Sequence, residues 1–269
     1  MRTLLLGAGL LMISACVSVD PNASPETLYD DAVAAYDAEQ PVRAYRLLHA
    51  ASDAGSFDAD FALAEFFGTG RLPHAYPAGH GGKIAPADRI IAFNTFWGGW
   101  KHNEERAAQH QERGGERVRD LAASGDLHAM TALGVSLLYP FRDRYGIDTP
   151  QDLARGRQLL EQASLAGHAN ASFRLWTVAS MLDLDDNERL EYIARAEAQG
   201  HPHGFHMYAL TLLGEDPLQG LAYLDQHAEN GHAEATEMRD ETLRSMRAIA
   251  DTNDEVAAII AAWDAGTRS

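Results

Sequence analysis

The sequence predicts an all-α protein, an α-solenoid of about five stacked helix–turn–helix repeats with helical caps. The first observation is composition, because 46 of the 269 residues are Ala, the best helix former, whereas Val and Ile are scarce. The second is a glycine that recurs in similar surroundings, at Gly55, Gly125, Gly167, Gly200 and Gly231. The third is the spacing of these glycines, since intervals of 70, 42, 33 and 31 residues include the period in the thirties typical of helical repeats.

The first sixteen residues predict a targeting segment that does not belong to the fold. A positive start at Met1-Arg2 precedes an apolar stretch over 4–13, which has the length of a signal peptide. Ile13-Ser14-Ala15-Cys16 then resembles the lipobox of bacterial lipoproteins, and Cys16 is the only cysteine in the chain. The resemblance implies a signal peptide over 1–15, a diacylated Cys16 and a tether over 16–23. The alternative is an ordinary secretory signal with an incidental cysteine.

The residue after the cysteine and the charge of the chain predict where the body lies. Val17 stands where an Asp would resemble the inner-membrane retention signal, so the resemblance implies a lipid anchor in the outer membrane with the body in the periplasm. The formal net charge is −17. Such a body is repelled by anionic lipids and nucleic acids, so we expect the membrane to be contacted through the lipid only and no nucleic acid to be bound.

A first helix is predicted to begin after Ser24, because Ser24 is a good N-cap and Pro25 suits the first helical position. An apolar stripe follows at Leu28, Ala32, Ala35 and Tyr36. The repeats follow, and each places the same residue types around its glycine. Four residues later stand small residues, at Ala59, Ala129, Ala171, Gly204 and Ala235. Seven residues earlier stand branched apolar residues, at Leu48, Val118, Leu160, Ile193 and Leu224. These offsets lie on one face of each helix, and the glycine ends the first helix in the left-handed conformation.

Aligning the repeats on their glycines also shows two helix N-caps and three residues that depart from the repeat pattern. Ser56 and Asp126 are good N-caps for the second helix, whereas His occupies this position in the last three repeats. Eleven residues before the glycine the residue is small, except at Arg189, and Gly204 replaces the alanine of the other repeats. Arg239 occupies an apolar position of the last repeat, which therefore looks like a degenerate cap.

This register resembles the Sel-one-like repeat family, which is related to the tetratricopeptide repeat. The motifs that carry the resemblance are Leu121-Ala122-Ala123-Ser124-Gly125-Asp126-Leu127-His128-Ala129, then Leu133-Gly134, and the Gly68-Thr69-Gly70 loop. The resemblance covers roughly 40–245. It implies a scaffold that binds protein or peptide partners and is not an enzyme.

Residues 71–113 predict an insertion, with a loop over 71–86 and a long helix over 87–113. Its candidate binding residues are His74, Tyr76, His80, Trp97 and Trp100, and both lysines of the chain, Lys83 and Lys101, lie nearby. A binding surface is one interpretation; the other is an irregular repeat whose aromatic residues fill the core. Beyond it, Thr149-Pro150 predicts another capped helix start, and Val256, Ile259, Ile260 and Trp263 predict a closing helix.

No motif predicts catalysis, a metal or a cofactor. The histidines of 201–206 lack the spacing of a zinc helix, and Asp183 to Glu188 resembles a calcium loop whose required glycine is missing, so an acidic turn is favoured. We therefore expect an adaptor whose protein or peptide partner is basic. The alternatives are a peptidoglycan or small-molecule binder, or a cell-wall enzyme, acting through 71–101, and a structural lipoprotein that binds itself. Relatives linked to cell-wall chemistry carry cysteine pairs, which this chain lacks.

Overall fold

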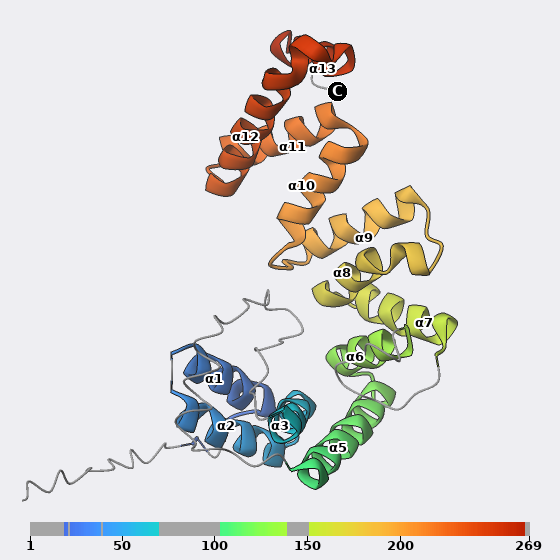
Figure 1. Ribbon diagram of the computed structural model, residues 1–269. Coiled ribbons are helices and arrows are strands. Elements are labelled where there is room, and N and C mark those ends of the chain that lie inside the picture. Colours follow the sequence, from blue (N-terminus) through green and yellow to red (C-terminus); the bar gives the residue numbers. More distant parts are fainter. Residues whose placement is uncertain (1–18, 21, 39, 70–102, 139–150, 267–269) are drawn as a thin grey trace, which may run out of the picture. The chain divides into compact units, whose positions relative to one another are not determined.

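The computed structural model describes residues 19–20, 22–38, 40–69, 103–138 and 151–266. These residues form twelve α-helices, two short 3-10 helices and no strand, which confirms the predicted all-α class (Figure 1). The chain forms two compact units, and the division falls after Gly114, within α5 (Glu104–Ala123).

Helices pair along the chain, and each pair is one repeat. The five pairs are α2 (Pro41–Ala54) with α3 (Phe57–Thr69), α5 with α6 (Leu127–Leu138), α7 (Leu153–Leu165) with α8 (Ala169–Thr177), α9 (Asp186–Ala198) with α10 (Gly204–Glu215), and α11 (Pro217–Glu229) with α12 (Ala233–Ile249). α1 (Pro25–Asp37) precedes them, and α13 (Asp254–Asp264) follows. Two 3-10 turns, Ala179–Met181 and Ala250–Thr252, follow α8 and α12.

A glycine with positive φ separates the two helices of every pair. The φ angles of these five glycines lie between 80° and 111°, a region that costs glycine little because it has no Cβ. The residue after each glycine donates its backbone N–H to the carbonyl five positions earlier, at 2.9–3.0 Å. This hydrogen bond satisfies a carbonyl at the end of the first helix and turns the chain into the second.

Small residues set how closely the helices approach one another. The alanines four residues after the glycine are fully buried, at Ala59, Ala129, Ala171 and Ala235. At Gly204 even a Cβ would be too large, since it would lie 2.6 Å from the Cα of Glu197 on the preceding helix. A Cβ on Gly156 would likewise lie 2.9 Å from the carbonyl oxygen of Gly134. The departure from alanine at position 204 is therefore steric.

The first unit packs α1, α2 and α3 around one apolar core. Ser24 caps α1 by accepting the backbone N–H of Thr27 at 3.1 Å. The core is formed by Leu28, Tyr29, Ala32, Ala35, Ala44, Leu47, Leu48, Ala51, Ala59, Ala62, Leu63, Phe66 and Phe67. Ser56 caps α3 through the N–H of Ala59, as the sequence predicted.

The second unit contains the repeats from Gly115 onwards. The apolar residues seven positions before each glycine are fully buried there, at Val118, Leu160, Ile193 and Leu224. Asp126 caps α6 by accepting the N–H of Ala129 at 2.7 Å, which confirms the predicted cap. These buried positions recur in every repeat of the unit, so each helix pair turns the same register of apolar residues inward.

Two predicted helices need corrected boundaries. The helix predicted over 87–113 is interrupted at Asn103, which accepts the N–H of Arg106 at 3.0 Å, and α5 then runs from Glu104 to Ala123 without a break. Gly114 lies inside this helix, where a Cβ would stand only 3.0 Å from the ring of Phe61, so the small residue allows this close approach. The cap of α7 is Asp152, which accepts the N–H of Arg155, and not Thr149. The terminal stripe does form α13, but none of its side chains is fully buried.

Candidate functional site

The residues that the sequence singles out for anchoring and ligand binding lie outside the described residues. They are Cys16, His74, Tyr76, His80, Trp97 and Trp100. Their roles therefore stay predictions, and the candidate site below is built from described residues of the second unit.

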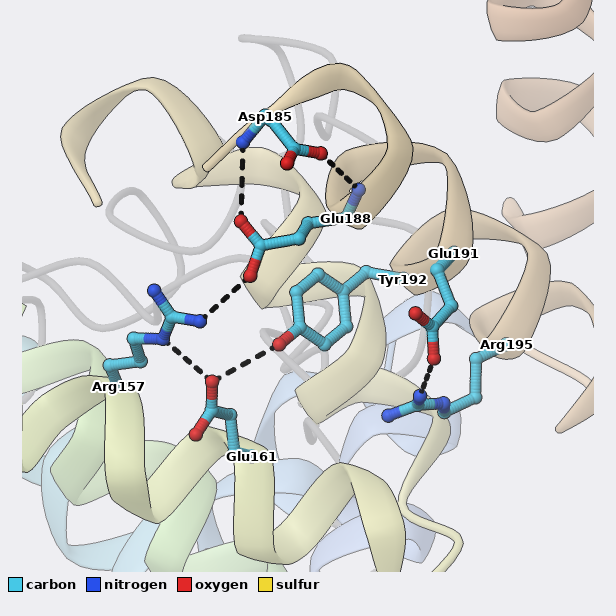
Figure 2. Close-up of polar contacts among 7 residues, drawn as sticks. All are labelled: Arg157, Glu161, Asp185, Glu188, Glu191, Tyr192 and Arg195. Atoms are coloured by element: carbon cyan, nitrogen blue, oxygen red, sulfur yellow. Dashed lines mark hydrogen bonds and ion pairs between the residues drawn. The ribbon is translucent and has the colours of Figure 1, made fainter. Parts of the chain in front are cut away.

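A ladder of polar contacts connects α7 with α9 (Figure 2). Arg157 on α7 donates from Nε to Oε1 of Glu161, one turn later, at 2.6 Å. Its Nη2 donates to Oε1 of Glu188 on α9 at 3.0 Å. The hydroxyl of Tyr192 on α9 donates to the same Oε1 of Glu161 at 3.1 Å. Each carboxylate thus bridges the first helices of two consecutive repeats.

Glu188 also fixes the start of α9. Its Oε2 accepts the backbone N–H of Asp185 at 3.2 Å, while Oδ1 of Asp185 accepts the N–H of Glu188 at 2.9 Å. This reciprocal capping box satisfies two N–H groups at the helix start, so the acidic segment is the predicted turn. One carboxylate therefore caps the helix with one oxygen and holds Arg157 with the other (Figure 2).

A buried chain of hydrogen bonds continues the ladder inward. Ser172 donates to Oε1 of Gln199 at 2.7 Å, so Ser164 is the donor in the 2.7 Å contact between the two serines. The amide of Gln199 returns a hydrogen bond to the carbonyl of Ser164 at 2.8 Å, and Arg195 donates to the Ser164 hydroxyl at 3.1 Å. Both serines are fully buried, so this network satisfies groups that would otherwise destabilise the core.

The first unit has a related cluster with a charge at its centre. Asp60 is fully buried, and its Oδ1 accepts from Ser52 at 2.8 Å, from Nε of Arg113 at 2.8 Å and lies 3.1 Å from Nδ1 of His110. Burial raises the pKa of Asp60, but the hydrogen bonds from His110, Arg113 and Ser52 outweigh it and hold this pKa below its usual range. Asp60 is therefore a buried carboxylate stabilised by an arginine.

This cluster contains a serine, a histidine and an aspartate, the residue types of a nucleophilic triad, but they contact one another in a different order. In a triad the histidine lies between the serine and the carboxylate and takes the serine proton. Here Ser52 donates to Asp60 directly, and Arg113 neutralises the carboxylate. The contacts therefore differ from those of a triad, and they join α2, α3 and α5.

Both clusters occupy the same repeat positions, which the sequence analysis missed. Ser52 and Ser164 stand three residues before their glycines, and Asp60 and Ser172 stand five residues after. The serine and its partner are eight residues apart in both repeats and face one another across the helix pair. Comparing these two polar positions along the repeats would have found them.

A second missed pair lies in the last repeat. Arg239, on the predicted apolar position, donates to Oδ1 of Asp225 at 2.8 Å. Asp225 is only 7% exposed, so the pair replaces an apolar contact between α11 and α12 with an ion pair. In the sequence Asp225 is one more acidic residue of an acidic helix, and nothing there shows that Arg239, fourteen residues later, contacts it.

Among the residues that the structure describes, no group of three or more His, Cys, Asp or Glu could hold a metal ion. His201 stacks on Phe173 with 4.0 Å between ring centroids, whereas His206 pairs with Glu234 at 3.0 Å. No single helix in the described ranges is long and apolar enough to span a membrane. α5 and α6 reach the necessary length and apolar composition only when taken together, and the chain bends by 117° between them.

No family model matches the chain, and no curated protein matches it either. Among solved structures, it is similar to a Sel1 repeat protein. That protein, from Oxalobacter formigenes, is 17% identical over 83% of this chain and 75% of its own, with a TM-score of 0.41.

The polar side chains of the ladder are partly accessible to solvent. Hydrogen bonds to Glu161 and Glu188 raise the pKa of Arg157, and burial raises the pKa of Tyr192. The side chains of Glu161, Glu188 and Glu191 are 34%, 39% and 67% exposed. Such carboxylates can accept hydrogen bonds from a basic side chain that approaches them.

Proposed function

We propose that the chain is a repeat lipoprotein anchored in the outer membrane, whose periplasmic body is a non-enzymatic adaptor for a basic protein or peptide. The observation that carries the proposal is the charge of the described repeats. Residues 151–266 contain 20 Asp and Glu against eight Arg and no Lys, a formal charge of −12. Concentrated negative charge attracts basic partners and raises the rate at which they associate.

The acidic side chains are distributed over several repeats. Glu191 on α9 and Glu234 and Glu241 on α12 have side chains that are 67%, 52% and 63% exposed. Repeat proteins bind extended partners over several units, so a basic segment would meet carboxylates from successive repeats. The anchoring part of the proposal is supported by the lipobox-like motif that ends at Cys16.

Cross-linking in cells followed by affinity capture and mass spectrometry tests the adaptor. We expect a short, reproducible set of envelope proteins from the wild type and reduced capture from a Cys16→Ser variant, which lacks the lipid. Membrane fractionation and the mass of the purified chain report the anchor independently. Capture of no protein above background would contradict the adaptor.

Salt dependence tests the electrostatic part separately. Binding of a captured partner to the purified chain should weaken between 0.05 and 0.5 M NaCl, because salt screens charge–charge attraction. A variant with Glu234, Glu237 and Glu241 changed to Gln should bind more weakly. The matched control changes Glu26→Gln, Asp30→Asn and Asp31→Asn on α1. Binding that 0.5 M salt leaves unchanged would exclude a charge-driven contact.

A second candidate function is peptidoglycan or small-molecule binding through 71–101, and its support is the set of aromatic and histidine side chains in that segment. The test is co-sedimentation of the purified chain with peptidoglycan. We expect Trp97→Ala or His80→Ala to abolish sedimentation if this function is correct. Absence of the wild-type chain from the pellet would rule out peptidoglycan.

A further inference from the structure

Histidines come in pairs in the described part of the chain. Of its nine histidines, eight form four pairs whose ring centroids are 5.9 to 6.0 Å apart. The pairs are His49 with His110, His128 with His168, His201 with His203, and His227 with His232. Three of these pairs contain the residue that follows a repeat glycine. Two rings this close cannot both be charged without repelling one another.

The histidine after each of these glycines contacts the second helix of the preceding repeat. His201 stacks on Phe173 of α8, with 4.0 Å between ring centroids and 9° between ring planes. His232 lies 4.5 Å from the ring of Phe205 on α10. His168 has its Nδ1 2.9 Å from the hydroxyl of Thr131 on α6. These imidazoles therefore form part of the packing between consecutive repeats.

The hydrogen bonds of His201 require its neutral form. Its Nδ1 accepts the backbone N–H of His203 at 3.2 Å, in the turn that leads into α10. A proton on Nδ1 would place two N–H groups against each other and break this bond. The side chain cannot simply turn to water, because His201 is only 7% exposed and lies against Phe173.

The ionisable groups around His201 also oppose its protonation. They are Arg174 on α8, His168 at the start of α8, and His203 before α10, and each carries or can take up positive charge. Burial first, and then these neighbours, lower the pKa of His201 from its ordinary 6.5 to about 4. A protonated imidazole would gain some cation–π attraction to Phe173, but this is smaller than the cost of burying the charge.

We propose that His201 is an acid-sensitive latch between repeats: its neutral ring holds the α9–α10 repeat against α8, and proton uptake releases it. The proton comes from solvent and binds to Nδ1 in place of the His203 N–H. The direction follows from linkage, because the open form takes up the proton near pH 6.5 and the closed form only near pH 4. The latch is therefore fully closed above pH 6.5 and weakens as the pH falls toward 4.

Hydrogen exchange of the full chain at pH 7.5 and 5.0 measures the opening directly, provided that protection factors corrected for the intrinsic pH dependence of exchange are compared. One imidazole with a pKa of 6.5 in the open form and about 4 in the closed form gives at most about 30-fold more opening at pH 5.0. Water that reaches the ring in the closed form would lower this factor toward about tenfold. We expect this loss of protection at the α9–α10 turn and the start of α10. Nuclear magnetic resonance of the histidine rings should show His201 still neutral at pH 5.

His201→Asn separates the latch from general acid sensitivity. The Asn side-chain oxygen can accept the same N–H two residues later and does not titrate, so protection in this variant should not change with pH. His206→Asn is the matched control, because His206 is half-exposed and pairs with Glu234, away from Phe173; it should keep the wild-type response. The proposal is overturned if wild-type protection is equal at both pH values, if His201→Asn retains the full response, or if His201 titrates near pH 6.5.

Discussion

Single small residues decide how closely these helices pack. Gly204 and Gly214 lie on the same helix, α10, and neither has positive φ. A Cβ at position 204 would lie 2.6 Å from the backbone of α9, whereas nothing lies within 4 Å of one at position 214. The packing of α10 therefore requires a glycine at position 204 but not at position 214, a difference that the sequence does not show.

Changing each of these glycines to alanine should shift stability in opposite directions. Gly204→Ala must push α10 away from α9, so we expect the free energy of unfolding to fall by about 1–3 kcal/mol. Gly214→Ala meets no neighbour and restricts the unfolded chain, so we expect a gain of about 0.5–1 kcal/mol. Urea unfolding followed by circular dichroism measures both. A Gly204→Ala variant as stable as the wild type would show that α10 can move without cost.

At the scale of elements, charged groups join helices that apolar packing brings together. In the first unit, Asp60 on α3 contacts Ser52 on α2 and both His110 and Arg113 on α5. A buried carboxylate is stabilising only while these donors remain, because without them nothing compensates the free-energy cost of removing its charge from water. Removing the arginine should therefore affect three helices together.

Arg113→Met tests the contribution of the Arg113–Asp60 ion pair, because its effect on the free energy of unfolding should depend on pH. Without the arginine, burial should raise the pKa of Asp60 above its ordinary value, so the variant should be less stable by about 2–4 kcal/mol at pH 7. In the wild type the carboxylate contributes stability above its ordinary pKa and loses it as the pH falls through the lowered folded value. The stability difference should thus be largest at pH 7 and shrink as acid protonates Asp60 in the variant.

The measurement is urea unfolding at several pH values between 4 and 7. Arg43→Met is the control. Arg43 is exposed on α2, and its Nη1 donates one long hydrogen bond, of 3.3 Å, to Oε1 of Gln40 three residues earlier. Adding Asp60→Asn to Arg113→Met should recover part of the stability at pH 7. A stability difference that is the same at every pH would show that Asp60 stays charged without Arg113.

At the scale of the whole molecule, one charge distribution should have two opposite salt effects. A formal charge of −17 makes the folded chain repel itself, and the same charge attracts a basic partner. Salt weakens both interactions, because the Debye length falls from about 20 Å at low ionic strength to about 6 Å at 0.3 M. Stability and partner binding should therefore respond to salt with opposite signs.

Raising NaCl from 0.02 to 0.3 M should increase the melting temperature of the chain by a few degrees, as repulsion between carboxylates is screened. Thermal unfolding followed at 222 nm measures this, and sucrose at matched osmolality controls for solvent effects other than charge. A melting temperature that falls with salt would mean that ion pairs such as Arg157–Glu188 outweigh the net repulsion.

The sequence by itself determined the repeats and where most of their helices end. The five glycines, the caps at Ser56 and Asp126 and the buried apolar positions are local features, since a helix end depends on residues within about one turn. Local signals also produced errors where packing overrides them, as in the helix that continues through Gly114 to Ala123. The close approach at Gly114 is to the ring of Phe61, more than fifty residues earlier in the chain.

Only the tertiary structure decided which polar groups meet. Glu161 and Tyr192, or Ser164 and Arg195, are 31 residues apart, and their contacts depend on how one helix pair is rotated against the next. The same holds for His201, which looks like a poor helix cap in the sequence and is a neutral ring stacked on Phe173 in the fold. Hydrogen bonds need atoms placed to within a few tenths of an ångström, and a repeat pattern fixes which residues are buried but not this placement.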